Sequence, residues 1–295
     1  MQSCALCTKK TNLKESHIIP KFVSEWIKKT GITGFLRNSE NDYRKREQDG
    51  IKKNLLCEEC EGLFSKVEKK FSETIFIPYL KENKTEFDYQ EWLNYFVTSV
   101  NWRVLYLEVI DYLNGEANIT QNNIEEITKI TRELGEYLLG NKSFPSSIES
   151  HIYFLNDLSF ISHAHLRPIS FFRRSVFGFL LEDYEPFEYC YVYSNLAGII
   201  IVTAIKKTKI DIWNNTLIVN QGKLTTNQLM GSPVLGDLIL VLEQANQGSV
   251  PDHQAQKIVE QLQKNKDKIE KSKFLEEFLK DQELQELSRK LFKEE

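Results

Sequence analysis

Four of the five cysteines fall into two Cys-x-x-Cys pairs, and this spacing constrains the fold more than any other feature of the chain. Cys4 and Cys7 form the first pair, and Cys57 and Cys60 form the second. Two intervening residues allow both thiolates of a pair to bind one tetrahedral ion. In a reducing cytosol such pairs favour a metal site over disulfides. We therefore predict one structural Zn²⁺ ion bound by these four thiolates.

The second cysteine pair stands at the start of a predicted helix. Apolar residues recur at helical spacing from residue 61 to residue 77. The backbone N–H groups at the start of such a helix point at the thiolates and offset their negative charge. A cysteine knuckle combined with a helix-borne pair is the arrangement of a treble clef. Residues 37–54 are polar and charged, and they are predicted to form a long loop between the two halves.

Two short runs near the cysteines resemble the signature of the HNH endonuclease family. The first is ESHIIP at residues 15–20, and the second is NLLCEEC at residues 54–60. The resemblance covers about residues 1–75. It implies a ββα-metal core in which the two cysteine pairs bind a structural zinc ion.

The chemistry that this resemblance implies is metal-assisted hydrolysis of a phosphodiester. His17 matches the family's general base, which deprotonates the attacking water, and Asn54 matches the residue that orients the imidazole. A divalent ion, Mg²⁺ or Mn²⁺, stabilises the charge of the transition state. Glu61 and Glu68 are the candidate ligands because hard cations bind carboxylates.

The sequence departs from the family pattern at two positions. Ser16 stands where the family usually has an acid or a histidine, and the helix after the second cysteine pair contains no histidine. Glu15 is a candidate to substitute for the missing acid, but on a strand it points to the opposite face from Ser16. Three interpretations stay open: a variant active site, the same fold without catalysis and with His17 bonded in the core, or an unrelated treble clef.

Charge is distributed unevenly along the chain. Residues 1–80 contain 15 Lys and Arg against 11 Asp and Glu, whereas residues 81–295 contain 23 against 31. Only the N-terminal part therefore has the sign expected of a nucleic-acid-binding surface. The residues predicted to contact phosphates are Arg37, Arg44, Lys45, Arg46, Lys52 and Lys53. The alternative is a solvated loop with interleaved acids. The pattern does not choose between DNA and RNA.

The chain as a whole predicts an α+β protein with four segments. These are a zinc-binding HNH-like module at 1–80, a helical bridge at 81–147, an antiparallel β-rich domain with a closing helix at 148–250, and a charged amphipathic helical tail at 251–295. Within them, helices are predicted at 88–113, 118–139 and 225–247, and strands at 151–155, 171–181, 189–193, 198–205 and 210–219.

Two further features have structural explanations. His163 and His165 share one face of a strand if that segment is extended, and His151 is nearby in the sequence. No acid or cysteine flanks them, so a structural role is favoured over a second metal site. Cys190 stands in an apolar run and is predicted to be a small buried hydrophobe.

No apolar run reaches the ~18 residues that span a bilayer, and the N-terminus does not resemble a signal peptide. We expect a cytoplasmic protein with no membrane partner. The first functional hypothesis is a nucleic-acid-binding, HNH-type nuclease of bacterial antiviral defence, where the family's modules occur joined to other domains. The alternative is a non-catalytic, zinc-stabilised adaptor or ligand-binding protein. In either case the C-terminal helices are candidates for binding a protein partner or a second copy.

Overall fold

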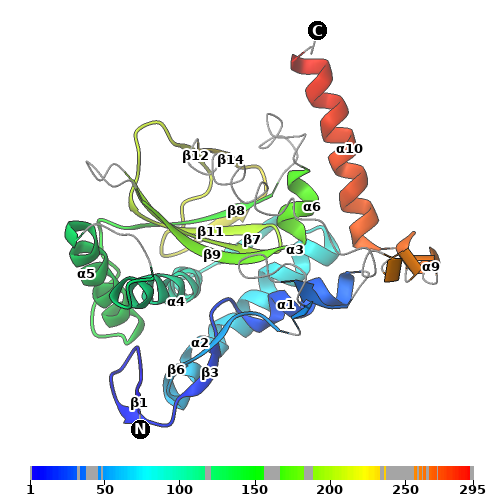
Figure 1. The fold of residues 1–295 in the computed structure, drawn as a ribbon. Helices are drawn as coiled ribbons and strands as arrows, with labels where there is room; N and C mark the ends of the chain where they lie inside the picture. Colours follow the sequence, from blue (N-terminus) through cyan, green and yellow to red (C-terminus); the bar gives the residue numbers. More distant parts are fainter. Residues whose placement is uncertain are drawn as a thin grey trace.

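A four-stranded antiparallel sheet covers one side of a long helix, and a small N-terminal module covers the other side (Figure 1). The computed structural model describes residues 2–31, 34–37, 46–47, 49–116, 121–155, 167–182, 189–232, 236, 256–257, 259–260, 262–263, 266–270 and 272–292. This mixture of helices and antiparallel strands confirms the predicted α+β class.

The central sheet has the strand order β8-β11-β10-β9. Its members are β8 (Glu149–Phe154), β9 (Val176–Glu182), β10 (Cys190–Leu196) and β11 (Ile199–Lys206). The turn between β10 and β11 consists of Ala197 and Gly198, which both have positive φ angles. A two-residue turn of this kind matches the right-handed twist of the strands that it joins.

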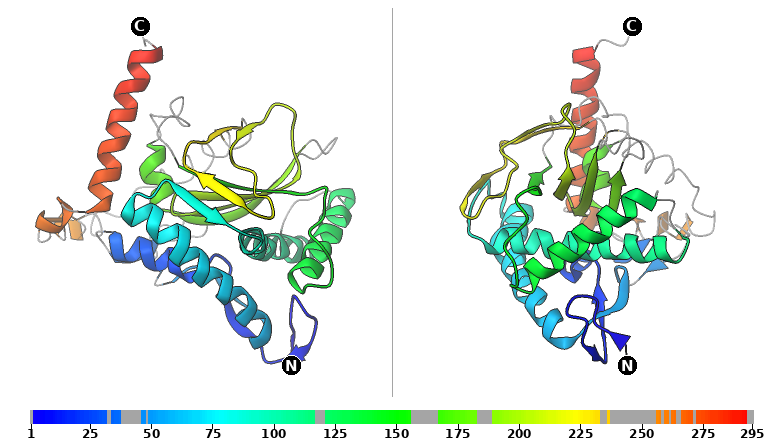
Figure 2. Two further views of the ribbon diagram at one scale, coloured as in Figure 1. Left: turned by 180° about the vertical axis from the view of Figure 1, so that it is seen from behind. Right: turned by 90° about the vertical axis from the view of Figure 1, so that its left-hand side faces the viewer.

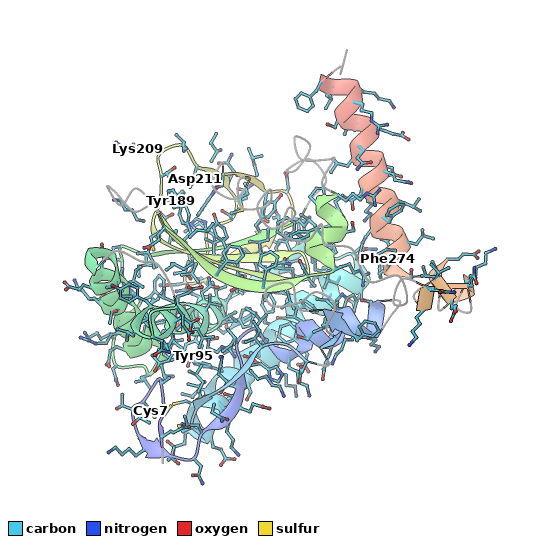
Figure 3. The ribbon with its side chains drawn as sticks, in the orientation of Figure 1. Cys7, Tyr95, Tyr189, Lys209, Asp211 and Phe274 are labelled. Atoms are coloured by element: carbon cyan, nitrogen blue, oxygen red, sulfur yellow. The ribbon has the colours of Figure 1, made fainter. Side chains whose placement is uncertain are left out.

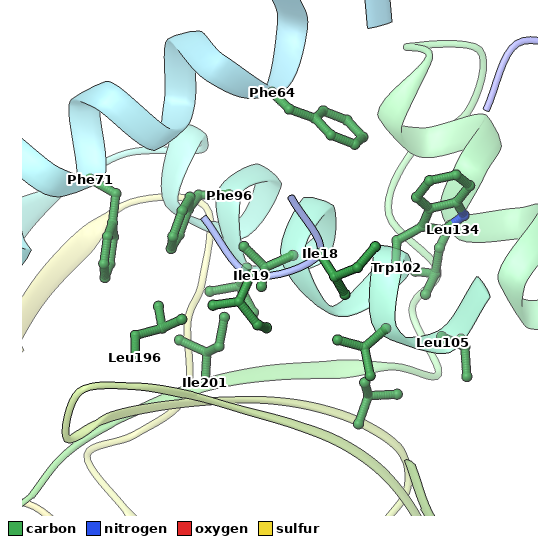
Figure 4. Close-up of a cluster of buried hydrophobic side chains, with 14 of the residues drawn as sticks. Ile18, Ile19, Phe64, Phe71, Phe96, Trp102, Leu105, Leu134, Leu196 and Ile201 are labelled. Atoms are coloured by element: carbon green, nitrogen blue, oxygen red, sulfur yellow. The ribbon is translucent and has the colours of Figure 1, made fainter. Parts of the chain in front are cut away.

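The helix α4 (Trp92–Leu113) packs on one face of this sheet and is buried on nearly every side. Side chains alternate along the strands, so that Val192 and Ile201 face α4. Asn101 of α4 donates to the carbonyl of Val192, and its side-chain oxygen accepts a bond from Ser194. Figure 4 shows Ile201 and Leu196 of the sheet close to the aromatic side chains of this layer.

The opposite face of the sheet is aromatic. Tyr153, Tyr191 and Tyr193 are buried there with α6 (Pro168–Arg173). The carboxylate of Asp281, in α10 (Lys273–Phe292), accepts hydrogen bonds from the backbone N–H groups at the start of α6. Figure 2 shows that α10 then leaves the body of the molecule. The short α9 (Lys266–Ile269) precedes it.

The N-terminal module consists of short strand pairs and helices. In chain order these are β1 (Gln2–Ser3), β2 (Lys10–Thr11), β3 (Lys14–His17), α1 (Lys21–Thr30), β4 (Leu36–Arg37), β5 (Arg46–Glu47), β6 (Lys52–Leu56) and α2 (Glu58–Phe71). The pairs are β1 with β2, β3 with β6, and β4 with β5. Phe71 of α2 stacks on Phe96 of α4 with 4.0 Å between ring centroids (Figure 4). One continuous hydrophobic core therefore joins the module to the sheet.

Helix α2 continues through a π-helical turn, η1 (Ser72–Phe76), into α3 (Ile77–Glu82). This confirms the helix predicted over residues 61–77, which begins at Glu58. Tyr79 of α3 donates to the carbonyl of Leu155 at the end of β8. The same helical rod thus contacts the module through α2 and the sheet through α3.

Three predicted elements are wrong in type or extent. The helix expected at 88–113 begins only at Trp92, because β7 (Glu86–Tyr89) pairs with β13 (Gly222–Thr225). Phe171 lies in α6, where Pro168 starts a helical turn, and not in a strand. The segment from residue 225 includes β14 (Leu229–Gly231), which pairs with β12 (Ile212–Asn214), and residues 237–250 lie outside the described residues.

Other expectations agree more closely. The helix expected at 118–139 is α5 (Gln121–Leu138), and Cys190 is fully buried. The loop expected at 37–54 contains the strand pair β4–β5 and the start of β6. The pair His163 and His165 lies outside the described residues. In the described part of the chain, no helix has the length and apolar character needed to cross a bilayer.

Glu182, at the end of β9, is a buried acid. Both carboxylate oxygens are inaccessible to solvent and accept no hydrogen bond from the part of the chain that the structure describes. Burial, assisted by the charge of Glu108, raises the pKa of Glu182 from its ordinary value to about 7. An acid whose pKa is higher in the folded than in the unfolded state destabilises the fold as the pH rises. This loss of stability occurs over the pH range from the ordinary pKa of 4.5 to the raised pKa of about 7.

We therefore expect the ionisation of Glu182 to lower the free energy of unfolding between pH 5 and pH 8, and Glu182→Gln to remove this contribution. After allowance for solvent screening, the difference between the two proteins at pH 8 should be on the order of 1–2 kcal/mol. Urea denaturation at both pH values measures it. Glu283→Gln, at an exposed position of α10, is the control. Identical pH dependence in wild type and Glu182→Gln would contradict the assignment.

Candidate metal centre and the ribbon beside it

The four paired cysteines converge on one point. Their sulfur atoms all lie within 4.8 Å of one another, and the Sγ atoms of Cys7 and Cys57 are 3.7 Å apart. Zinc–sulfur bonds of ~2.3 Å in a tetrahedron place sulfur atoms about 3.8 Å apart. The cluster therefore has the dimensions and the donor atoms to hold a metal ion such as zinc. Figure 3 shows Cys7 at the N-terminal end of the molecule, far from Tyr189 and Asp211.

Local backbone structure creates this convergence. The first pair stands in a tight turn in which Thr8 N–H donates to the carbonyl of Cys4, and Thr8 adopts a positive φ. The N–H of Ala5 donates to the carbonyl of Leu55, which ties this turn to β6. Cys57 caps the N-terminus of α2, and its own N–H donates to the sulfur of Cys4. The turn and the helix start thus face each other.

The electrostatics of the cluster favour a bound cation. Burial raises the pKa of Cys4, but backbone N–H groups of Cys7, Cys57 and Leu6 outweigh it and lower the pKa to about 7. Burial and the neighbouring thiols raise the pKa of Cys60 well above its ordinary value. Closely spaced thiolates repel one another, so full ionisation of the cluster requires a positive ion at its centre.

His17 ends β3 and faces an aspartate. Its Nε2 atom lies 3.1 Å from Oδ2 of Asp49, and the side chain of His17 is 18% exposed. Burial raises the pKa of Asp49, but the hydrogen bond and the charge of His17 outweigh it, so the pKa lies below its ordinary value. Lys52, which is opposite His17 in the β3–β6 ribbon, lies 3.7 Å from the same carboxylate oxygen. Asp49 is therefore an ionised partner for the imidazole.

In the sequence, Asp49 is only one of several acids in a charged loop. Its position before Gly50, where the chain turns into β6, brings it back to the end of β3. The ribbon register pairs His17 with Lys52, three residues after Asp49. Only this register, which the sequence does not specify, identifies the contact.

The two candidate carboxylates already have partners. Ser16, fully buried, donates its hydroxyl proton to Oε2 of Glu61 at 2.7 Å. Glu68 accepts from the guanidinium of Arg103 at 2.7 Å. Because neighbouring strand residues face opposite sides, the Ser16–Glu61 pair lies on the other side of the ribbon from the His17 ring.

The remaining predicted residues occupy the surface of the ribbon or lie outside the described chain. Asn54 is exposed and lies opposite Glu15. Lys52 is bonded to Glu15 at 2.7 Å, whereas Lys53 is exposed. Arg37 and Arg46 occupy paired positions of β4 and β5. Arg44 and Lys45 lie outside the described residues.

The structure therefore groups the predicted residues into separate contacts. His17 meets Asp49, Glu61 meets Ser16, and Glu68 meets Arg103. Across the described residues, the four cysteines are the only group of three or more His, Cys, Asp or Glu side chains placed to share a metal ion. A preformed three-ligand site for a second, catalytic cation is thus not assembled from these residues.

Comparisons of this chain with protein-family models, with curated proteins and with solved structures find no significant match.

We expect Cys57→Ser to abolish binding of one metal ion per chain, because three thiolates do not complete the tetrahedral shell. Elemental analysis of the purified proteins measures this. Loss of a structural metal belongs to the most destabilising class of changes, so the free energy of unfolding should fall by more than about 4 kcal/mol. Cys190→Ala removes a thiol outside the cluster and should retain the metal. Equal metal content in the wild type and Cys57→Ser would contradict the prediction.

Proposed function

We propose that the N-terminal module is a zinc-supported, HNH-like unit that binds nucleic acid and hydrolyses phosphodiester bonds with His17 as the general base. The observation that carries the proposal is the His17–Asp49 contact at the end of β3. The ribbon β3–β6 leads directly into α2, which begins at the second cysteine pair. This order of two strands, cysteine pair and helix supports the ββα-metal arrangement and the treble clef implied by the sequence resemblance.

The contact places a carboxylate beside one ring nitrogen of His17. When Nε2, which lies 3.1 Å from Oδ2 of Asp49, carries the ring proton, Nδ1 keeps its lone pair. Nε2 is inaccessible to solvent, so the exposed 18% of the side chain belongs to other atoms of His17. A water molecule bonded to Nδ1 then loses its proton to the imidazole as it attacks phosphorus. Asp49 performs the orienting role that the sequence suggested for Asn54.

A divalent ion, Mg²⁺ or Mn²⁺, would supply charge stabilisation on the phosphate oxygens. Magnesium often binds through one or two carboxylates together with substrate phosphates. Glu61 is the candidate because it is hydrogen-bonded to Ser16, the residue at the ligand position of the family. Glu68 is the weaker candidate because it is paired with the buried Arg103.

A second function is supported by the same contacts. If Glu61 and Glu68 stay in their pairs with Ser16 and Arg103, the module is a non-catalytic, zinc-stabilised adaptor. The location of the Ser16–Glu61 pair on the other face of the ribbon from His17 favours this interpretation. The sheet and the C-terminal helices would then bind a protein or a small ligand. A role in bacterial defence is compatible with both functions.

For the hydrolase, we expect His17→Ala to abolish cleavage of plasmid DNA or structured RNA that depends on Mg²⁺ or Mn²⁺. Asp49→Asn should reduce the rate by about 10²-fold, at the low end of general-base effects, because the imidazole no longer has an ionised partner. Gel assays with and without chelator measure both, and His253→Ala is the matched control. Zinc content is checked in every variant. No cleavage by a wild-type protein with intact zinc would contradict the hydrolase and favour the adaptor.

Binding of nucleic acid is tested separately from cleavage. The triple variant Arg44→Ala, Lys45→Ala, Arg46→Ala should weaken binding to DNA and RNA. The slope of log K against log salt should become shallower by about 0.7–0.9 for each phosphate that the variant no longer neutralises. Filter binding over a salt series measures the slope. The control is Arg289→Ala with Lys290→Ala, two exposed residues of α10. An unchanged slope in the triple variant would show that this segment does not contact phosphates.

A further inference from the structure

Arg103 of α4 is fully enclosed, with 1% of its surface exposed, and it reaches from the central helix into the N-terminal module. One terminal nitrogen donates to the carbonyl oxygen of His17 at 2.7 Å. The other donates to Glu68 at 2.7 Å. Nε donates to the carbonyl of Ser99, one turn earlier in α4, at 3.1 Å. The guanidinium carbon lies 5.3 Å from the ring centroid of Phe64.

These contacts depend on the planar guanidinium group of an arginine, whose N–H donors point in fixed directions. Three nitrogens bond to three acceptors on three different elements, β3, α2 and α4 itself. The ammonium of a lysine is a compact point charge and does not reproduce this fixed geometry. Charge-assisted hydrogen bonds are also stronger than neutral ones. The arginine is therefore matched to this position in shape as well as in charge.

The bond to His17 fixes the peptide unit that follows the proposed base. The carbonyl of His17 accepts from Arg103, and the N–H of Ile18 donates to the carbonyl of Ile51 at 3.0 Å. Both polar groups of this peptide are thus held, from opposite sides. The ladder with β6 holds the preceding backbone of β3. The direction in which the His17 side chain leaves the backbone follows from these constraints.

The anchor of Arg103 is itself rigid. Asn101, two residues earlier in α4, donates to the carbonyl of Val192 and to the hydroxyl of Thr203 in the central sheet. The backbone of this turn of α4 is therefore fixed relative to the sheet. Glu68, 18% exposed, compensates the charge of the buried guanidinium.

We propose that Arg103 is the positioning residue for His17: it sets, from α4, the placement of the imidazole against Asp49. The catalytic part of this inference depends on the proposed hydrolase, whereas the placement of the imidazole does not. The central helix α4 then determines the orientation of the His17 side chain in the N-terminal module. The cysteine cluster alone does not determine this orientation.

The test compares Arg103→Lys with the wild-type protein. The lysine keeps a positive charge beside Glu68, but it has no guanidinium group to donate a second hydrogen bond to the carbonyl of His17. Histidine side chains labelled with ¹⁵N report the imidazole directly by NMR, and His17→Gln assigns its signal among the five histidines. We expect the Nε2 resonance of His17 and the midpoint of its titration to shift, while the other four histidines stay unchanged. Arg132→Lys, at an exposed position of α5, is the matched control and should shift none of them.

Activity gives a second readout. A displacement of about 1 Å in a catalytic group costs on the order of 10²-fold in rate. We expect Arg103→Lys to lower kcat by about this factor with little change in KM, because binding of the substrate is not affected. Shifted His17 signals in a protein without any hydrolase activity would support the positioning role and overturn the proposed function. Normal His17 signals and normal kcat in an active Arg103→Lys variant would overturn the positioning role alone.

A measurement on the wild type covers the case in which Arg103→Lys does not fold. The guanidinium N–H groups of Arg103 should give separate NMR signals that exchange slowly with water, since all of them are buried and three nitrogens are bonded. Rapid exchange of these groups in the folded wild-type protein would overturn the inference without any variant.

Discussion

Three consecutive residues of α4 form hydrogen bonds to three different parts of the structure, and these bonds connect the layers of the fold. Asn101 bonds to the central sheet, Trp102 donates its indole N–H to the carbonyl of Thr131 in α5, and Arg103 bonds to the N-terminal module. Successive residues of a helix point about 100° apart, so the side chains of a single turn can contact three different neighbouring elements. This requires a stretch of helix that is buried on all sides, and residues 96–105 of α4 form such a stretch. The polar groups that it buries here are bonded, which avoids the cost of leaving them unpaired.

The cysteine cluster and α2 could be predicted from the sequence because local rules determine them. Cysteine spacing limits the geometry of a thiolate site, and apolar periodicity identifies the helix that follows. Local rules are not sufficient where contacts with residues far away in the sequence determine the secondary structure. The helix expected from Asp88 starts later because residues of β13, more than a hundred positions away, pair with β7. Phe171 has the side chain of a strand residue, yet Pro168 and the cap from Asp281 favour a helical turn.

In the candidate site, too, local sequence and distant contacts determine different features. The residues of the motif could be identified, but not their partners, because those depend on the ribbon register and on the packing of α4. Asp49 is indistinguishable from other acids of its loop until β6 is placed against β3. Arg103 is equally hidden in the sequence, since an arginine in a helix usually faces solvent. Whether the module hydrolyses phosphodiesters therefore depends on contacts that the motif does not contain. The burial of Arg103 also makes the module a part of the larger core, which joins residues from Cys4 to Leu224.

The π-helical turn η1 sets the rotation of α3 relative to α2. A π-helical turn closes its hydrogen bonds between residues five positions apart, so it contains one residue more than the α-helical turn that it replaces. Removing one residue from Ser72–Phe76 would restore a regular helix and rotate α3 by about 100° relative to α2. Tyr79 would then turn away from the carbonyl of Leu155. The extra residue of η1 thus reconciles the phase of α2, which carries the second cysteine pair, with the phase in which α3 contacts the sheet.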